Sequence, residues 1–101
     1  VKRNGNGIFY DGSSTYDGQW ADDEMQGEGT MAFDTGAKYA GLFAFNKFSG
    51  RGKYTWPDGT HYDGQWRANV MHGEGTMTDL EGRRWVGRFY DGKGHQLCLE
   101  V

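Results

Sequence analysis

The sequence predicts an all-β fold, a single-layer, elongated meander of consecutive β-hairpins. Three observations lead to it: a 23-residue repeat, a period-two alternation of apolar side chains within each repeat, and a composition rich in rings and glycine. The 101 residues include 18 glycines and 16 aromatic residues, but Val, Ile and Leu together number only nine. So few aliphatic side chains cannot fill a core between two layers, and so many rings are untypical of a disordered chain. We therefore expect rings to pack against glycine.

The repeat is visible in two segments that recur 46 residues apart. Residues 16–20 (Tyr-Asp-Gly-Gln-Trp) recur unchanged at 62–66, and residues 27–31 (Gly-Glu-Gly-Thr-Met) recur at 73–77. A related segment stands halfway, at 39–43, so the period is 23. Terminal units of stacked arrays depart from the template because they cap it. The sequence thus divides into a half-repeat (1–15), three repeats (16–38, 39–61 and 62–84) and a degenerate capping repeat (85–101).

Each repeat is expected to form one β-hairpin. Tyr, Gly and Trp or Phe alternate with polar residues in the first half of the repeat, so they share one face of a strand. Six loop residues, such as 21–26, are expected to join the two strands, and a glycine-bearing turn, such as 34–38, to lead to the next hairpin. Asp23, Asn46 and Asn69 share one loop position, and these residue types tolerate a left-handed backbone.

The expected strand pairing places rings beside glycines. The expected pairs are Trp20–Gly27, Gly18–Gly29 and Tyr16–Met31 within the first hairpin, and Phe33–Tyr39, Met31–Gly41 and Gly29–Phe43 between hairpins. A ring over a neighbouring glycine recovers packing that a strand glycine forfeits. The residues assigned to this structural role are Gly18, Trp20, Gly27, Gly29, Gly41, Phe43, Gly50, Gly52, Gly64, Trp66, Gly73, Gly75 and Gly87.

No catalytic, cofactor or metal site is predicted. The glycine pairs precede further strands, whereas a phosphate-binding loop opens a helix. His61, His72 and His95 lack the spacing of zinc ligands, and Cys98, in an apolar tail, is expected to be buried. A one-layer sheet offers little cavity in which carboxylate pKa values could shift for acid–base catalysis. The net charge of −3 argues against nucleic-acid binding, and the single cysteine suits a reducing, cytoplasmic setting.

Two groups of residues are candidate contacts for a partner protein. Ala40, Leu42 and Phe45 are apolar where the other repeats are mostly polar, and such exposed groups mark an interface unless they pack locally under a loop. The equivalent residues Tyr16, Tyr39, Tyr62 and Trp85 are expected to form a row of aromatic contacts, spaced ~10 Å apart by two strand widths.

The pattern Tyr-x-Gly-x-Trp followed by Gly-x-Gly, at a 23-residue period, resembles the MORN (membrane occupation and recognition nexus) repeat over about residues 5–90. The tail at 78–85, running on to Leu97 and Leu99, is similar to the end of the small stand-alone MORN repeat-containing protein 2 type. The resemblance implies rods of β-hairpins that act as protein-interaction modules. It also implies structural roles in cilia and flagella, including radial spoke heads, or in cytoskeleton near membranes.

We therefore expect a non-enzymatic scaffold that binds other proteins of a larger assembly, in a ciliary or flagellar axoneme or another cytoskeletal structure of the cytoplasm. No small-molecule substrate is expected. The alternative is a membrane-surface adaptor that binds acidic phospholipids. Its basic group would be Arg83, Arg84, Arg88 and Lys93, diluted by nearby acidic residues.

Overall fold

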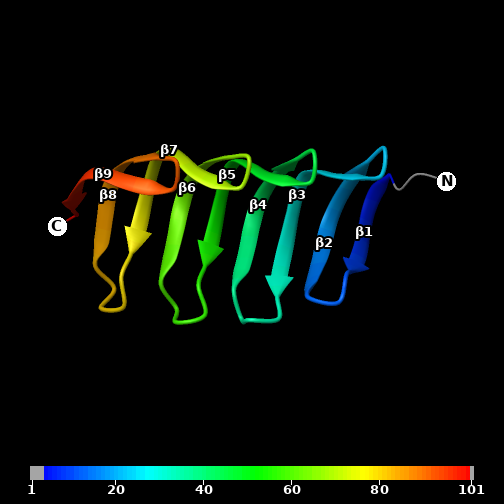
Figure 1. Ribbon diagram of the computed structural model, residues 1–101, viewed down its shortest axis with the longest axis horizontal. Helices are drawn as coiled ribbons and strands as arrows, with labels where there is room; N and C mark the ends of the chain where they lie inside the picture. Colours follow the sequence, from blue (N-terminus) through cyan, green and yellow to red (C-terminus); the bar gives the residue numbers. More distant parts are fainter. Residues whose placement is uncertain (1–3, 101) are drawn as a thin grey trace.

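The computed structural model describes residues 4–100 as one open sheet of nine antiparallel strands in sequence order (Figure 1). The strands are β1 (Gly5–Tyr10), β2 (Ser14–Ala21), β3 (Glu24–Phe33), β4 (Lys38–Ala44), β5 (Lys47–Thr55), β6 (His61–Arg67), β7 (Val70–Thr78), β8 (Arg84–Tyr90) and β9 (Lys93–Leu99). Residues 1–3 and 101, the outer ends of the expected half-repeat and capping repeat, lie outside the described residues. The predicted all-β meander is confirmed.

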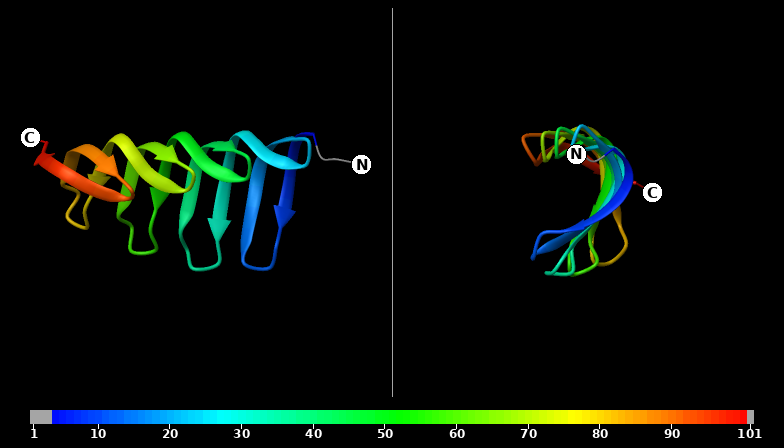
Figure 2. Two further views of the ribbon diagram at one scale, coloured as in Figure 1. Left: turned by 45° about the horizontal axis from the view of Figure 1, so that its top comes forward. Right: turned by 90° about the vertical axis from the view of Figure 1, so that its right-hand side faces the viewer.

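The sheet is a trough about twice as long as it is wide, with extents of 50 × 24 × 19 Å. Each strand bends along its length, so the sheet has a C-shaped cross-section when seen end on (Figure 2). The turns lie at the two ends of the C, and we call them the lips of the trough. The linker lip comprises the turns 11–13, 34–37, 56–60 and 79–83, and the hairpin lip comprises the turns 22–23, 45–46, 68–69 and 91–92. A one-layer sheet buries side chains only on the side toward which it bends, which we call the inner face.

The turns of the hairpin lip have two residues each, so the expected six-residue loops are wrong. In all four turns both residues have positive φ: Asp22 and Asp23, Phe45 and Asn46, Ala68 and Asn69, Asp91 and Gly92. This is the type I′ pattern, whose twist matches that of the flanking strands, so pairing resumes at once. The expected left-handed backbone at Asp23, Asn46 and Asn69 is confirmed.

A β-bulge follows each such turn and explains a second error. Gly18 pairs with Gly29 and Tyr16 with Met31 as expected, but Trp20 pairs with Met25 instead of Gly27. Gly27 has φ +84° within the bulge, and the Gln19 side chain lies over it. The carboxamide oxygen of Gln19 accepts the N–H of Glu28 at 2.8 Å, which satisfies a backbone donor that the bulge removes from the ladder.

The expected register between hairpins is wrong by two residues. The observed pairs are Met31–Tyr39, Gly29–Gly41 and Gly27–Phe43. The cause is a tight linker turn, in which the Phe33 N–H donates to the Ala37 carbonyl at 2.9 Å and Gly36 has φ +101°. The hydrogen bond between Phe33 and Ala37 encloses three residues, 34–36, of which the last has a left-handed backbone. A three-residue loop of this kind is common in β-hairpins.

As a result, the central glycines of successive strands stand opposite one another, and the ring that covers them is tyrosine. A Cβ added to Gly29 would overlap the ring of Tyr16, and the same relation joins Gly52 to Tyr39 and Gly75 to Tyr62. The tryptophans lie beside other glycines than those expected. Trp20 pairs with Gly5, and its indole lies over Gly7, to whose carbonyl Nε1 donates at 3.3 Å. Trp66 pairs with Gly50, and its Nε1 donates to the Gly52 carbonyl at 2.9 Å. The expectation that rings pack beside glycine is confirmed, with the tyrosines as additional rings and with other glycine partners than expected.

The last hairpin departs from the template by one residue, and Cys98 is therefore exposed, not buried as expected. Its pairs are Trp85–Leu99 and Val86–Cys98, whereas the other repeats would pair the Trp85 position with residue 100. A shift of one residue exchanges the two faces of a strand, so Cys98 joins Val86 on the outer face. Leu97 then lies over Gly87 in the place of a tyrosine ring.

Candidate interaction surfaces

The inner face is uncharged along all nine described strands. Its buried rings are Tyr16, Trp20, Tyr39, Phe43, Tyr62, Trp66 and Phe89. Partly buried side chains pack against them and face the trough: Met25, Met31, Phe48, Tyr54, Trp56, Met71, Met77 and Leu97. Rings and thioethers that remain partly exposed on a concave surface provide rigid and adaptable apolar contacts to a partner.

Two hollows meet at Trp56, at the end of β5. One, of about 450 Å³, is lined by Trp56, Pro57, Asp58, Thr60 and Met77. The other, of about 320 Å³, is lined mainly by rings that include Phe33, Phe48, Tyr54, Trp56 and Trp66. The Trp56 and Tyr54 ring centroids are 5.1 Å apart at an interplanar angle of 60°. Trp56 therefore separates two shallow apolar cavities, each large enough for a side chain of a partner.

The sequence interpretation did not single out Trp56 or Met77 as contacts. The usable signal was the apolar alternation, which continues past the glycine pair to Tyr54 and Trp56 and places rings at the linker lip. Because the hollows also depend on the curvature of the sheet, the sequence pattern alone could not reveal them.

Three of the four expected aromatic contacts are buried: Tyr16, Tyr39 and Tyr62 are 0–1% exposed. Each hydroxyl donates to the carbonyl three residues ahead, at 2.7 Å for Tyr16, 2.8 Å for Tyr39 and 2.9 Å for Tyr62. Tyr39 also stacks on Phe48 with centroids 3.9 Å apart. Burial raises the pKa of all three phenols, and that of Tyr62 to about 12. The expected row of exposed tyrosines is therefore wrong, because these rings fill the space above the glycines.

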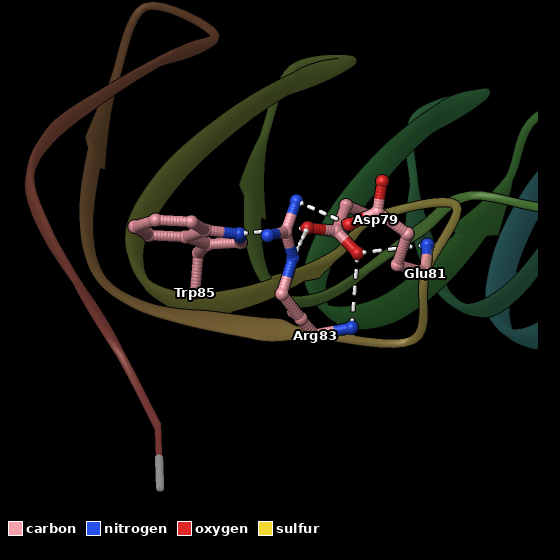
Figure 3. A network of polar contacts seen from close by, with 4 residues as sticks. All are labelled: Asp79, Glu81, Arg83 and Trp85. Carbon is pink, nitrogen blue, oxygen red and sulfur yellow. Dashed lines mark hydrogen bonds and ion pairs between the residues drawn. The ribbon is translucent and has the colours of Figure 1, made fainter.

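Trp85, the fourth member of the row, is partly buried and belongs to a polar network (Figure 3). Its Nε1 donates to the Asp79 carboxylate at 3.1 Å, and Arg83 Nε lies 2.8 Å from the same oxygen. Arg83 also pairs with Glu81 at 2.7 Å. The indole hydrogen bond, aided by donors from Arg83 and Glu81, lowers the pKa of Asp79 to about 2. The network fixes the last linker turn against β8.

Two further arginines of the basic group expected to contact lipid are also in ion pairs. Arg84 lies 3.1 Å from Glu100, and Arg88 lies 3.9 Å from Glu74. All four side chains are exposed, so these pairs add little stability, but they reduce the net positive charge of this region.

Ala40 and Leu42 lie on the outer face and are exposed, as the alternation predicts. Leu42 covers Gly50, in the way that Gln19 and Gln65 cover the glycines of their bulges. In a later repeat the Gln65 carboxamide oxygen accepts the N–H of Glu74 at 2.9 Å, and the Leu42 side chain has no acceptor with which to make the equivalent hydrogen bond. Packing on Gly50 therefore explains in part why an apolar residue stands at position 42, while the rest of the Leu42 side chain remains exposed.

Phe45 stands at the hairpin lip and is 72% exposed. Its φ is +51°, a conformation that a bulky side chain rarely adopts. The Phe45 N–H donates to the carboxamide oxygen of Gln26 at 3.2 Å, which holds the turn but leaves the ring exposed to solvent. A contact between this ring and a partner remains our prediction for Phe45.

Within residues 4–100 no three His, Cys, Asp or Glu side chains are placed to share a metal ion. That part of the chain also contains no helix long and apolar enough to cross a bilayer.

Comparison with known families matches the MORN repeat to residues 16–38, 39–61 and 62–79, which together are more than half of the chain. No curated protein matches the chain.

Proposed function

We propose a scaffold function for this chain, which belongs to the MORN repeat family. MORN repeats are non-catalytic modules that mediate protein and membrane interactions. Within that range, the chain holds an elongated segment of another protein along its inner face, as a structural component of a ciliary or flagellar axoneme or of another cytoskeletal assembly. The observation that carries the proposal is the uncharged inner face, with partly exposed rings around Trp56 along a trough 50 Å long.

A protein segment suits this surface better than a lipid headgroup. Lipid adsorption through the basic group would need free positive charge, and Arg83, Arg84 and Arg88 each lie within 4 Å of a carboxylate. Attraction to an anionic surface is worth ~1 kcal/mol per free basic residue, so little remains for membrane recruitment. Binding to acidic phospholipid vesicles at physiological salt, measured by flotation, would favour the alternative instead.

The proposal is tested by site-specific photo-crosslinking in ciliated cells. The photoreactive residue benzoylphenylalanine replaces one residue at a time: Trp56 on the inner face, Phe45 at the hairpin lip, Leu42 on the outer face and Thr30 as an outer-face control. We expect the same axonemal or cytoskeletal protein to be crosslinked from Trp56 and Phe45 and not from Thr30. Crosslinks from Leu42 would extend the contact to the outer face.

Localisation is tested with the same cells after detergent extraction. We expect the chain to remain with the insoluble axoneme or cytoskeleton, and the Trp56→Ala variant to move to the soluble fraction. Crosslinks from Thr30 alone, or equal retention of Trp56→Ala with a Thr30→Ala control, would contradict a scaffold that acts through its inner face.

A further inference from the structure

The charges of the trough indicate the kind of segment that it holds. We propose that the occupant is a basic, amphipathic segment of a partner protein, with apolar side chains on the ring-lined floor and Lys or Arg side chains at the two lips. This inference rests on the proposed function, since it specifies the chemistry of the segment held by the same inner face.

The first argument is the separation of charge between the lips and the outer face. The turns of the two lips contain eight acidic residues and one basic residue: Asp11, Asp22, Asp23, Asp34, Asp58, Asp79, Glu81 and Asp91 against Arg83. The outer face of the strands has the opposite excess. Its basic residues are Lys38, Lys47, Arg51, Lys53, Arg67, Arg84, Arg88 and Lys93, and its acidic residues are Asp17, Glu24, Glu28, Asp63 and Glu74. A segment in the trough therefore lies between two negatively charged margins.

The second argument is that the hydrogen bonds within the turns do not neutralise the carboxylates of Asp11 and Asp58. Asp11 accepts the N–H groups of Ser13 and Ser14 at 2.9 and 2.8 Å. Asp58 accepts the hydroxyl of Thr60 at 2.6 Å and the N–H of the same residue at 2.9 Å. These hydrogen bonds lower the pKa of Asp11 and Asp58, so both remain ionised at neutral pH. Because these donors are uncharged, the negative charges of Asp11 and Asp58 stay available to a partner, whereas Asp79 and Glu81 share theirs with Arg83.

The third argument is that an acidic side chain of the linker lip lies beside the apolar side chains of the trough. Asp58 lines the same hollow as Trp56 and Met77, which fits an apolar anchor followed by a cationic residue. An extended segment of about 15 residues spans the 50 Å trough at ~3.3 Å per residue. Acidic segments and anionic membranes would both be repelled by the lips.

The experiment is selection of a random library of linear 16-residue peptides, displayed on phage, against the full chain at physiological salt. Selection is repeated on Trp56→Ala and, because a tryptophan substitution can disturb folding, on Met77→Gln, each checked by circular dichroism. We expect enriched peptides that combine Leu, Phe or Trp with an excess of Lys and Arg and that are lost on both variants.

A pair of isosteric variants then tests the lips directly with the best selected peptide. Asp22→Asn with Asp34→Asn removes two charges from the lips, and Asp17→Asn with Asp63→Asn removes two from the outer face. We expect binding to weaken about five- to tenfold in the first and less than twofold in the second, with a steeper salt dependence for the unmodified chain.

The outcomes separate the two proposals. Peptides that require Trp56 and Met77 but are neutral or acidic, or equal effects of the two isosteric variants, would overturn the inference and leave the scaffold function standing. Enriched peptides that bind all variants equally, or no enrichment, would overturn both. Flotation of the chain itself with phosphatidylserine vesicles at physiological salt, in the absence of peptide, would also overturn the inference, in favour of a membrane ligand.

Discussion

The ring of Tyr39 on β4 covers the α-carbon of Gly52 on β5 so closely that a single added methyl group would overlap it. The hydroxyl of Tyr39 meanwhile donates to the Leu42 carbonyl at 2.8 Å, so the ring is fixed at both ends. The same arrangement recurs with Tyr16 and Gly29 and with Tyr62 and Gly75. In a sheet without a second layer, this contact supplies the core that an opposing layer would otherwise provide.

The first prediction concerns this contact. Gly29→Ala places a methyl group within the Tyr16 ring, and the ring cannot move away without losing its hydrogen bond to Gln19. We expect a loss of about 2–3 kcal/mol in the free energy of unfolding, measured by urea denaturation. Thr30→Val, on the exposed outer face of the same strand, is the control and should change it by less than 1 kcal/mol. Similar losses in the free energy of unfolding for Gly29→Ala and Thr30→Val would show that the contact between the Tyr16 ring and Gly29 does not stabilise the sheet.

The second prediction is a loss of stability at alkaline pH. The pKa of Tyr62 is raised from 10.0 to about 12 in the folded chain, mainly by burial. The unfolded chain therefore releases the phenolic proton more readily. The contribution of the Tyr62 phenol to the free energy of unfolding is therefore fully present below pH 10 and is lost as pH rises from 10 to about 12.

The measurement is the thermal unfolding midpoint by circular dichroism across this range. Tyr62→Phe should start from a lower midpoint at neutral pH, since its hydrogen bond to Gln65 is gone, and then fall less steeply. Tyr10→Phe, at an exposed ring, is the control. Parallel curves for Tyr62→Phe and the unmodified chain would rule out this phenol as the source of the alkaline sensitivity.

The repeat and the alternation were sufficient to predict the hairpins, their order and the open sheet, because a 23-residue period with period-two apolar faces leaves few other arrangements. They were insufficient for register. The register depends on whether Asp22 and Asp23 form a two-residue turn and whether Gly27 forms a bulge. The sequence pattern of the glycine pair is the same with or without the bulge. The two-residue error between hairpins follows from the tight turn at Gly36.

The candidate site shows the same limits. The alternation correctly placed Ala40 and Leu42 on the outer face, but it could not tell that the tyrosines opposite them are buried. Burial on a one-layer sheet depends on how far the sheet bends, and that curvature comes from bulges and turns. The hollows around Trp56 arise from the same bend, so the sequence pattern does not locate them.

The third prediction uses the difference between Leu42 and its equivalents. Leu42→Gln should add about 1 kcal/mol to the free energy of unfolding, because the carboxamide can accept the backbone N–H of the bulge as Gln65 does. Gln65→Leu is the reciprocal control and should lose a similar amount. Urea denaturation measures both. A Leu42→Gln variant that is less stable would show that the apolar cover over Gly50 outweighs the missing hydrogen bond.

The last prediction separates stability from binding at the hairpin lip. Phe45 has φ +51°, where asparagine is tolerated and phenylalanine is strained. Phe45→Asn should therefore raise the free energy of unfolding by about 1 kcal/mol. It should also weaken binding of the peptide selected on the trough, or of the crosslinked partner, about tenfold, because an exposed aromatic contact is removed.

Ala68 occupies the same turn position one repeat later, with φ +48°. Ala68→Asn is thus the matched control, since it relieves a left-handed backbone without removing a ring. It should stabilise the chain and leave binding unchanged. Thermal unfolding gives the first quantity and fluorescence anisotropy with the labelled peptide gives the second. If Phe45→Asn stabilises the chain and binds as well as Ala68→Asn, then the Phe45 ring has no part in the interface.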